Sequence, residues 1–250
     1  MSPRLAFALE TAQVAGDSTL KLFRDPESFS LKTNLTPVTE ADVNAEQIVR
    51  KRINEAYPTE LILGEEEGGD VNSLDRWIVD PIDGTKSFVC GVPLYATLLS
   101  YEVDREPIVG VACFPALGHM VYAEKGSGTF CDGSRVQVSS NNELQRAVVC
   151  CGGHASMEKR GLGQGLLDLS MKMMSTRTWC DAYGHFLVAT GRVDAMVDPI
   201  VSRWDISALA LIVREAGGKF TDVHGQEDLT DNAISSTPQM LGSILGAFRE

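Results

Sequence analysis

The feature that most restricts how this chain can fold is the segment WIVDPIDGT at residues 77–85. Its apolar start is typical of a buried strand, and it ends abruptly in two carboxylates followed by Gly-Thr. Leu61 to Leu63, followed by Gly64-Glu65-Glu66, repeats the same change from apolar to acidic residues. Buried strands of this kind deliver polar residues to the edge of a sheet, so we expect acidic side chains to emerge where the strands end.

Hydrophobic periodicity predicts a fold that mixes helices with sheets, in two halves at residues 1–145 and 146–250. In the first half, Ser2-Pro3 begins a helix, Thr39-x-x-Asp42 is a capping box that begins a second, and residues 94–138 indicate an antiparallel meander. In the second half, helices and strands alternate. We expect strands at 147–150, near 174 and at 193–197, and helices at 181–190 and from Asp205 to the stop at Gly217-Gly218.

Charge and cysteine usage narrow the class of protein. The chain has 250 residues and 22 basic against 34 acidic side chains, a net charge of −12 that argues against nucleic acid as a partner. An anionic substrate would need the acidic surplus to be neutralised, for which divalent cations are the obvious candidates. The six cysteines show no zinc-type spacing and are expected to be reduced. No signal peptide or membrane helix is apparent, so we expect a cytoplasmic protein without a membrane partner.

Three acidic sites along the chain are candidates for metal chemistry. Asp80 and Asp83, with a carbonyl between them on a kinked loop, offer the oxygen ligands that hard divalent cations prefer, and Gly84 lets the backbone approach a phosphate. Each site also has a simpler interpretation. The segment D-P-x-D-G is typical of a turn, Glu65-Glu66 of a solvated surface, and Asp205 of a helix cap. Their joint occurrence favours the metal site.

In this order and at these separations, GEE, WIVDPIDGT and WDISALALIVREAGG resemble the inositol monophosphatase superfamily over nearly the whole chain. The resemblance implies an α+β fold built as a layered α/β/α/β/α sandwich, two or three Mg²⁺ ions per site, and a homodimer. Position by position, it implies that Asp42, Thr85 and Glu65 are catalytic, that Gly84 and Thr85 bind phosphate, and that Lys32 lies near the metals. The implied metal ligands are Glu65, Asp80, the carbonyl of Ile82, Asp83 and Asp205.

The substrate side of this family is built largely from the second half, where RTWCDAYGHFLVATGRVDAMVDP resembles the histidinol-phosphate phosphatase branch. Cys180 and His185 replace the usual Gly and Tyr of that run. Asp181 and Asp198 suit a leaving group with positive charge, and Arg177 is a further candidate contact. The simpler alternative makes Asp181 a helix cap and Asp198 a turn residue.

Other polar residues carry weaker signals. His119, His154 and His224 have no spacing that marks a set of ligands, and we expect them to face solvent or lie in loops. The sequence does not decide whether Arg203 is a surface charge or a substrate contact.

The expected function is a Mg²⁺-dependent phosphomonoester hydrolase, with L-histidinol phosphate of histidine biosynthesis as its substrate and direct attack by metal-activated water. One alternative keeps the chemistry and changes the substrate to inositol 1-phosphate, a sugar phosphate or a 3′-phosphonucleotide. Another is a non-catalytic phosphate-binding regulatory protein. Such a protein would be expected to have lost a metal ligand or water-orienting residue, and none is missing here.

Overall fold

The computed structural model describes residues 1–24, 29–31, 37–179 and 181–249. The helices are α1 (Pro3–Thr19), α2 (Glu40–Ala56), α3 (Thr85–Val89), α4 (His154–Lys159), α5 (Gly163–Ser170), α6 (Asp181–Ala189), α7 (Arg203–Glu215) and α8 (Pro238–Gly246), with a short 3₁₀ turn at Leu144–Arg146. The strands are β1 (Phe29–Leu31), β2 (Pro37–Thr39), β3 (Leu61–Gly64), β4 (Arg76–Asp83), β5 (Ala96–Val103), β6 (Glu106–Phe114), β7 (His119–Glu124), β8 (Thr129–Cys131), β9 (Ser134–Val136), β10 (Val148–Cys151), β11 (Ser175–Arg177), β12 (Ala195–Asp198), β13 (Lys219–Thr221) and β14 (Ala233–Ser236).

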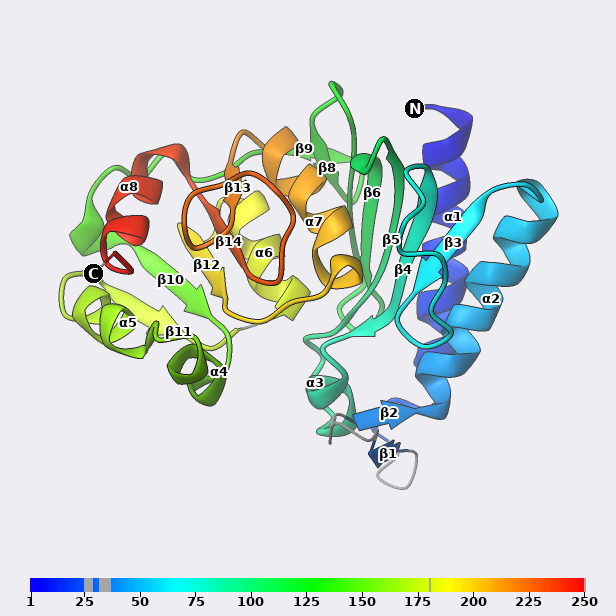
Figure 1. Cartoon of the computed structure of the whole chain (residues 1–250), viewed down its shortest axis with the longest axis horizontal. Helices are drawn as coiled ribbons and strands as arrows, with labels where there is room; N and C mark the ends of the chain where they lie inside the picture. Colours follow the sequence, from blue (N-terminus) through cyan, green and yellow to red (C-terminus); the bar gives the residue numbers. More distant parts are fainter. Residues whose placement is uncertain (25–28, 32–36, 180, 250) are drawn as a thin grey trace.

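These elements stack in five layers, as Figure 1 shows. Helices α1 and α2 cover one face of the first sheet, α6 and α7 fill the space between the two sheets, and α4, α5 and α8 cover the far face of the second. The expected α/β/α/β/α sandwich is therefore confirmed. No helix within the described ranges is long and apolar enough to cross a membrane.

The first sheet has seven strands in the order β3-β4-β5-β6-β7-β8-β9. Only β3 and β4 run parallel; the antiparallel strands from β5 to β9 form the expected meander. The second sheet has the order β11-β10-β12-β14-β13 and is mixed, with β11, β10 and β12 parallel. The parallel pairs matter most for function, because their carboxyl ends bring separate stretches of chain to one sheet edge.

Three apolar clusters hold the layers together, one for each layer of helices, and the cluster around α6 and α7 contacts both sheets. Alanines of α1 and α2 pack with Trp77 on the outer face of the first sheet. The residues of α7 from Ile206 to Val213 are all buried, because this helix lies between two sheets and has little face left for water. At Gly110 of β6 a Cβ atom would lie 2.7 Å from the carbonyl oxygen of Ala208, so glycine lets α7 sit directly on the sheet.

Candidate metal and phosphate site

Strand β4 carries the first two acids of the site. It extends through Asp83, so Asp80 and Asp83 lie in the strand itself, and the prediction that they lie on a loop is wrong. The pairing register with β5 shifts between these two residues. Residues three apart face opposite sides of a regular strand, and such an irregularity allows both carboxylates to face the same pocket. Both residues are nearly fully buried.

Helix α7 brings the third acid to the same place. The helix begins at Arg203, slightly before the predicted start, and Asp205 lies in its first turn, where its Oδ2 accepts a 2.6 Å hydrogen bond from the backbone N–H of Ser202. One carboxylate oxygen from each of Asp80, Asp83 and Asp205 lies within 4.8 Å of the others. Segments more than 120 residues apart in sequence thus supply a cluster of oxygen atoms that could hold a metal ion.

Glu65 reaches this cluster from the neighbouring strand. Strand β3 is parallel to β4, Gly64 pairs with Val79, and Glu65 follows directly at the same sheet edge. Its loop is held by Glu46 of α2, which the sequence analysis missed. The buried Glu46 carboxylate accepts hydrogen bonds from the backbone N–H groups of Glu66 (2.8 Å) and Glu67 (3.0 Å). Glu46 lies one helical turn after Asp42, so both side chains are on the same face of α2, and this spacing could have indicated that Glu46 also faces the site.

Asp42 and Thr85 lie beside each other at the edge of the acidic cluster. The predicted capping box is present: Asp42 Oδ2 accepts a 2.7 Å hydrogen bond from the backbone N–H of Thr39. Thr85 Oγ1 lies 3.5 Å from Asp42 Oδ1 and donates to the carbonyl oxygen of Ile82 at 3.1 Å. Asp42 Oδ1 and the Thr85 hydroxyl are therefore close enough to share a small polar ligand.

Gly84 separates the acids from Thr85 and needs to be glycine. Its φ of 85° lies in the left-handed region, and a Cβ atom there would be 3.0 Å from the carbonyl oxygen of Leu94. Gly84 also lines the pocket, where a residue without a side chain lets the backbone approach a bound group closely.

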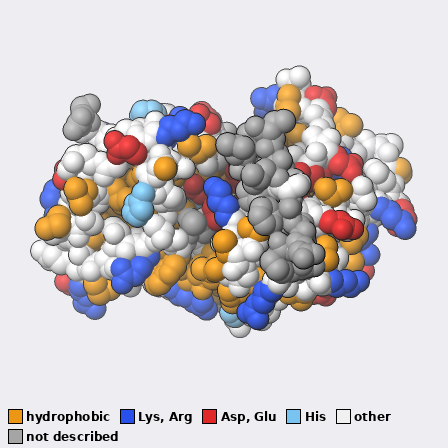
Figure 2. Space-filling model, turned by 90° about the horizontal axis from the view of Figure 1, so that it is seen from below, with side chains coloured by type: hydrophobic (Ala, Val, Ile, Leu, Met, Phe, Trp, Pro, Cys, Tyr) orange, Lys and Arg blue, Asp and Glu red, His pale blue; other side chains and the backbone are white. Residues whose placement is uncertain are grey.

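The pocket has a volume of about 270 Å³. It opens on the face that Figure 2 shows, where acidic side chains lie in the hollow between the two halves of the molecule. Besides the acids, Lys86 and Ser156 are polar groups in its wall that the sequence analysis did not single out. The described residues that line the pocket are Glu65, Asp80, Ile82, Asp83, Gly84, Thr85, Lys86, Ser156, Asp181, Asp198, Ile200, Val201 and Asp205.

The electrostatics of the cluster indicate cation binding. Burial, reinforced by the charges of Glu65 and Asp83, raises the pKa of Asp80 well above its usual value. Burial raises the pKa of Asp205 to about 7 and that of Asp42 to about 6. Among the described residues, no hydrogen-bond partner contacts the buried Asp80 Oδ1. Carboxylates concentrated in this way are disfavoured unless positive charge is present, so the residues fit hard divalent cations bound through oxygen.

Comparison with known proteins decides the family. The family model for the inositol monophosphatase family matches residues 1–249. The chain belongs to the inositol monophosphatase family. It is 42% identical over 253 residues to a histidinol-phosphatase of Chlorobaculum parvum, covering 99% of this chain and 97% of that protein. It is 36% identical to a histidinol-phosphatase of Streptomyces coelicolor, covering 99% and 96%.

Solved structures agree with this family assignment. The extragenic suppressor protein suhB from Bartonella henselae superposes with a TM-score of 0.93 at 29% identity, covering 100% of this chain and 99% of that one. Members of the inositol monophosphatase family are phosphatases that use metal ions. The chain is accordingly a phosphoric monoester hydrolase, and its acidic pocket contains groups suited to the metal.

Two of the four predicted substrate-side residues line the pocket of this family member. Asp181 lies at the start of α6 with a φ of 58°, and Asp198 ends β12. Arg177 lies elsewhere: it is exposed on the edge strand β11, where its guanidinium donates to the carbonyl oxygen of Thr176 at 2.8 Å. Lys32 falls outside the described residues.

His185 lies behind Asp198 and is almost completely buried. Its Nδ1 is 2.8 Å from the hydroxyl of Ser235, which fixes the ring, and its Nε2 is 3.9 Å from Asp198 Oδ2. His185, one of the two residues that depart from the branch pattern, therefore faces an acid of the pocket.

Arg203 is not an isolated surface charge. Its Nε donates to Glu102 at 2.7 Å, and the fully buried Glu102 also pairs with Arg76. This network ties the start of α7, and with it Asp205, to the first sheet.

Proposed function

We propose that the chain is a Mg²⁺-dependent phosphatase that hydrolyses L-histidinol phosphate by direct attack of water. One observation carries this proposal: the pocket that gathers Asp80, Asp83 and Asp205 is also lined by Asp181 and Asp198. Two additional carboxylates suit a leaving alcohol that carries an amine and an imidazole, because charge-assisted hydrogen bonds to such groups are strong. The names of the two histidinol-phosphatase relatives support the same substrate.

The proposed ligands of two or three Mg²⁺ ions are Glu65, Asp80, the Ile82 carbonyl, Asp83 and Asp205. Bound Mg²⁺ would lower the pKa of a coordinated water and offset the charge of the phosphate and of the departing oxygen. Glu46 and Ser202 position two of the proposed ligands. Glu46 holds the backbone beside Glu65, and the backbone N–H of Ser202 orients Asp205. The Gly84 backbone and the Thr85 hydroxyl would hold the phosphate oxygens.

Asp42 and Thr85 would orient the attacking water, and the Asp42 carboxylate would receive its proton. Asp42 Oδ2 is already engaged by Thr39, which leaves Oδ1 for the water and for Thr85. The single hydrogen of the Thr85 hydroxyl is directed to Asp42 or to the Ile82 carbonyl, so a lone pair of its oxygen remains to accept from water. The raised pKa of Asp42 makes this carboxylate a better proton acceptor than an exposed aspartate.

A phosphate-release panel tests the substrate. Purified enzyme is assayed with L-histidinol phosphate, inositol 1-phosphate, a sugar phosphate and a 3′-phosphonucleotide while Mg²⁺ is titrated. We expect histidinol phosphate to have the highest kcat/KM. Much faster turnover of any other ester would refute the substrate assignment, and full activity after removal of divalent cations would refute the metal chemistry.

Asp198→Asn tests the role of the acid pair. A hydrogen bond to a charged group contributes about 1.5–3 kcal/mol, so we expect the preference for histidinol phosphate over inositol 1-phosphate to fall by about 10- to 100-fold. The matched control is Asp228→Asn, which removes an exposed acid and should leave the preference unchanged. An unchanged preference in Asp198→Asn would mean that the substrate amine or imidazole binds elsewhere. We also propose a homodimer, which light scattering of the purified enzyme would test.

A further inference from the structure

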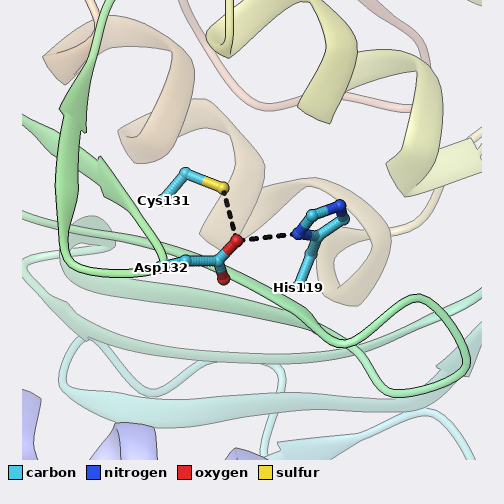
Figure 3. A group of neighbouring side chains, drawn as sticks. All are labelled: His119, Cys131 and Asp132. Carbon is cyan, nitrogen blue, oxygen red and sulfur yellow. Dashed lines mark hydrogen bonds and ion pairs between the residues drawn. The ribbon is translucent and has the colours of Figure 1, made fainter.

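A second group of potential metal ligands lies apart from the acidic pocket. His119 Nδ1, Cys131 Sγ and a carboxylate oxygen of Asp132 all lie within 4.8 Å of one another. Figure 3 shows the three side chains converging on Asp132 Oδ2, which is 2.7 Å from His119 Nδ1 and 3.6 Å from Cys131 Sγ. None of these residues is among the described residues that line the acidic pocket. Their sequence spacing is not one of the usual zinc motifs, which is why the sequence analysis did not group them.

The backbone explains how neighbouring residues come to share one ligand position. Strands β8 and β9 are joined by the two-residue turn Asp132-Gly133, with φ values of 50° and 79°. Turns with two positive φ values are typical of tight hairpins, and Asp-Gly is a preferred sequence for them. Adjacent residues of a regular strand face opposite sides, but the left-handed conformation of Asp132 turns its carboxylate toward the side of Cys131.

Contacts with the neighbouring strand and with α6 hold the side chains of Asp132 and His119 in place. The backbone N–H of Met120 donates to Asp132 Oδ1 at 2.8 Å, so Oδ2 is the oxygen directed at the cluster. The His119 ring stacks on Phe186 of α6 with centroids 5.8 Å apart and an interplanar angle of 30°. Hydrogen bonding therefore preorganises the Asp132 carboxylate, and ring packing preorganises His119.

Two of the three separations between ligand atoms are close to those of a tetrahedral metal site, and the third, between His119 Nδ1 and Cys131 Sγ, is within 4.8 Å. Zinc binds nitrogen and oxygen at about 2.0 Å and sulfur at about 2.3 Å, which puts tetrahedral ligand atoms about 3.3–3.5 Å apart. The S–O separation of 3.6 Å already agrees, and the N–O separation of 2.7 Å would have to open by well under an ångström. In the structure, the thiol hydrogen and, in the tautomer with Nδ1–H, the imidazole hydrogen point at the same oxygen, in the space where a cation would sit.

The ligand types and exposure select the kind of cation. A thiolate and a carboxylate balance the charge of a divalent ion, and sulfur together with imidazole favours zinc-like metals over Mg²⁺. Cys131 is buried, while the side chains of His119 and Asp132 are 34% and 44% exposed. Solvent can therefore reach the site and supply a fourth ligand.

We propose that His119, Cys131 and Asp132 form a binding site for a thiophilic divalent cation of the zinc class, with a solvent molecule completing the coordination. Binding replaces the thiol proton of Cys131 with the metal ion, and the released proton goes to solvent. The site is separate from the Mg²⁺ chemistry proposed for the acidic pocket and does not depend on it.

Cobalt(II) provides a direct test, because a Co–thiolate bond gives a charge-transfer band in the near ultraviolet that oxygen and nitrogen ligands do not give. The reduced protein is titrated with Co²⁺ in excess Mg²⁺, which is added to occupy the oxygen site. We expect a band that saturates at a stoichiometric amount of Co²⁺ and disappears when Zn²⁺ is added. The absence of a band in the unaltered protein would overturn the proposal.

Variants assign the sulfur. Cys131→Ser should abolish the band and weaken Zn²⁺ binding by at least about 100-fold. Mutation of residues that only hydrogen-bond to a metal ligand already lowers metal affinity by about 10- to 100-fold, and loss of a ligand should cost more. Cys90→Ser, at an exposed free thiol, and Cys180→Ser, next to Asp181 in sequence, are the matched controls and should retain the band. A band that persists in Cys131→Ser would refute the site.

His119→Ala gives a second reading if Cys131→Ser folds poorly. The residue is partly exposed, so its loss should leave phosphatase activity with Mg²⁺ and the far-ultraviolet circular dichroism unchanged. Loss of tight Zn²⁺ binding in this variant supports the proposal. Unchanged Zn²⁺ affinity would show that His119, Cys131 and Asp132 form only a hydrogen-bonded cluster.

Discussion

Replacing Asp42 by asparagine should stabilise the metal-free protein while abolishing most of its activity. The Asp42 side chain is fully buried, and burial raises its pKa from 3.8 to about 6, even though hydrogen bonds from Thr39 favour the charged form. At neutral pH the folded protein therefore holds this carboxylate ionised in an unfavourable environment. Asparagine keeps an oxygen that can accept from Thr39 but carries no charge.

The pKa values give the size and the pH dependence of the effect. Well below the unfolded pKa of 3.8, Asp42 is protonated in both the folded and the unfolded state and contributes nothing. Between the unfolded and the folded pKa, the unfolded state loses its proton first, so the free energy of unfolding falls as pH rises. A difference of about two pKa units corresponds to about 3 kcal/mol. Above pH 7, the free energy of unfolding of Asp42→Asn should exceed that of the unaltered protein by roughly this amount. Near pH 4 the two free energies should converge.

Urea denaturation in the presence of a chelator, repeated from pH 4 to pH 8, measures this difference. The matched control is Asp168→Asn, an exposed acid on α5, for which we expect no gain in stability that grows with pH. Phosphate release with Mg²⁺ is measured in parallel, because loss of the water-orienting oxygen should lower kcat. A variant less stable than the unaltered protein at pH 8, or a gain in stability independent of pH, would refute the reasoning.

Three further changes test the metal cluster and the packing around it. Asp83→Asn should lower phosphatase activity by at least about 100-fold with unchanged circular dichroism, and full activity would contradict the proposed ligand set. Gly110→Ala should lower the free energy of unfolding by about 1–3 kcal/mol, because the new methyl group meets the α7 backbone at Ala208; a thermal melt that does not shift would contradict this. Glu102→Ala should lower the free energy of unfolding, measured by urea denaturation, by about 3–5 kcal/mol, because it leaves Arg76 and Arg203 without their carboxylate partner. A loss below about 1 kcal/mol would mean that water already screens the two arginines.

Local signals predicted much of the fold. The capping box at Thr39 and Asp42, the strand that begins near Trp77 and the glycine after α7 depend on neighbouring residues, so short stretches of sequence were enough to place them. The order and spacing of the acidic motifs indicated the family, and hence the five layers. Helix α8 was not predicted, although Thr237-Pro238 is the same kind of start signal as Ser2-Pro3 at α1. Strands β13 and β14 are three and four residues long, and such short strands depend on tertiary packing more than on local preference.

The sequence by itself determined which residue types stand at the strand and helix ends, and therefore which chemistry is available to this protein. Only the tertiary structure decided how those residues meet: the irregular pairing that lets Asp80 and Asp83 face one pocket, the buried Glu46 that holds the loop of Glu65, and the turn that sets Asp132 beside Cys131 and His119. The physical reason is that hydrogen-bonding and steric preferences act over a few residues. Convergence of distant segments depends instead on how whole sheets and helices pack together.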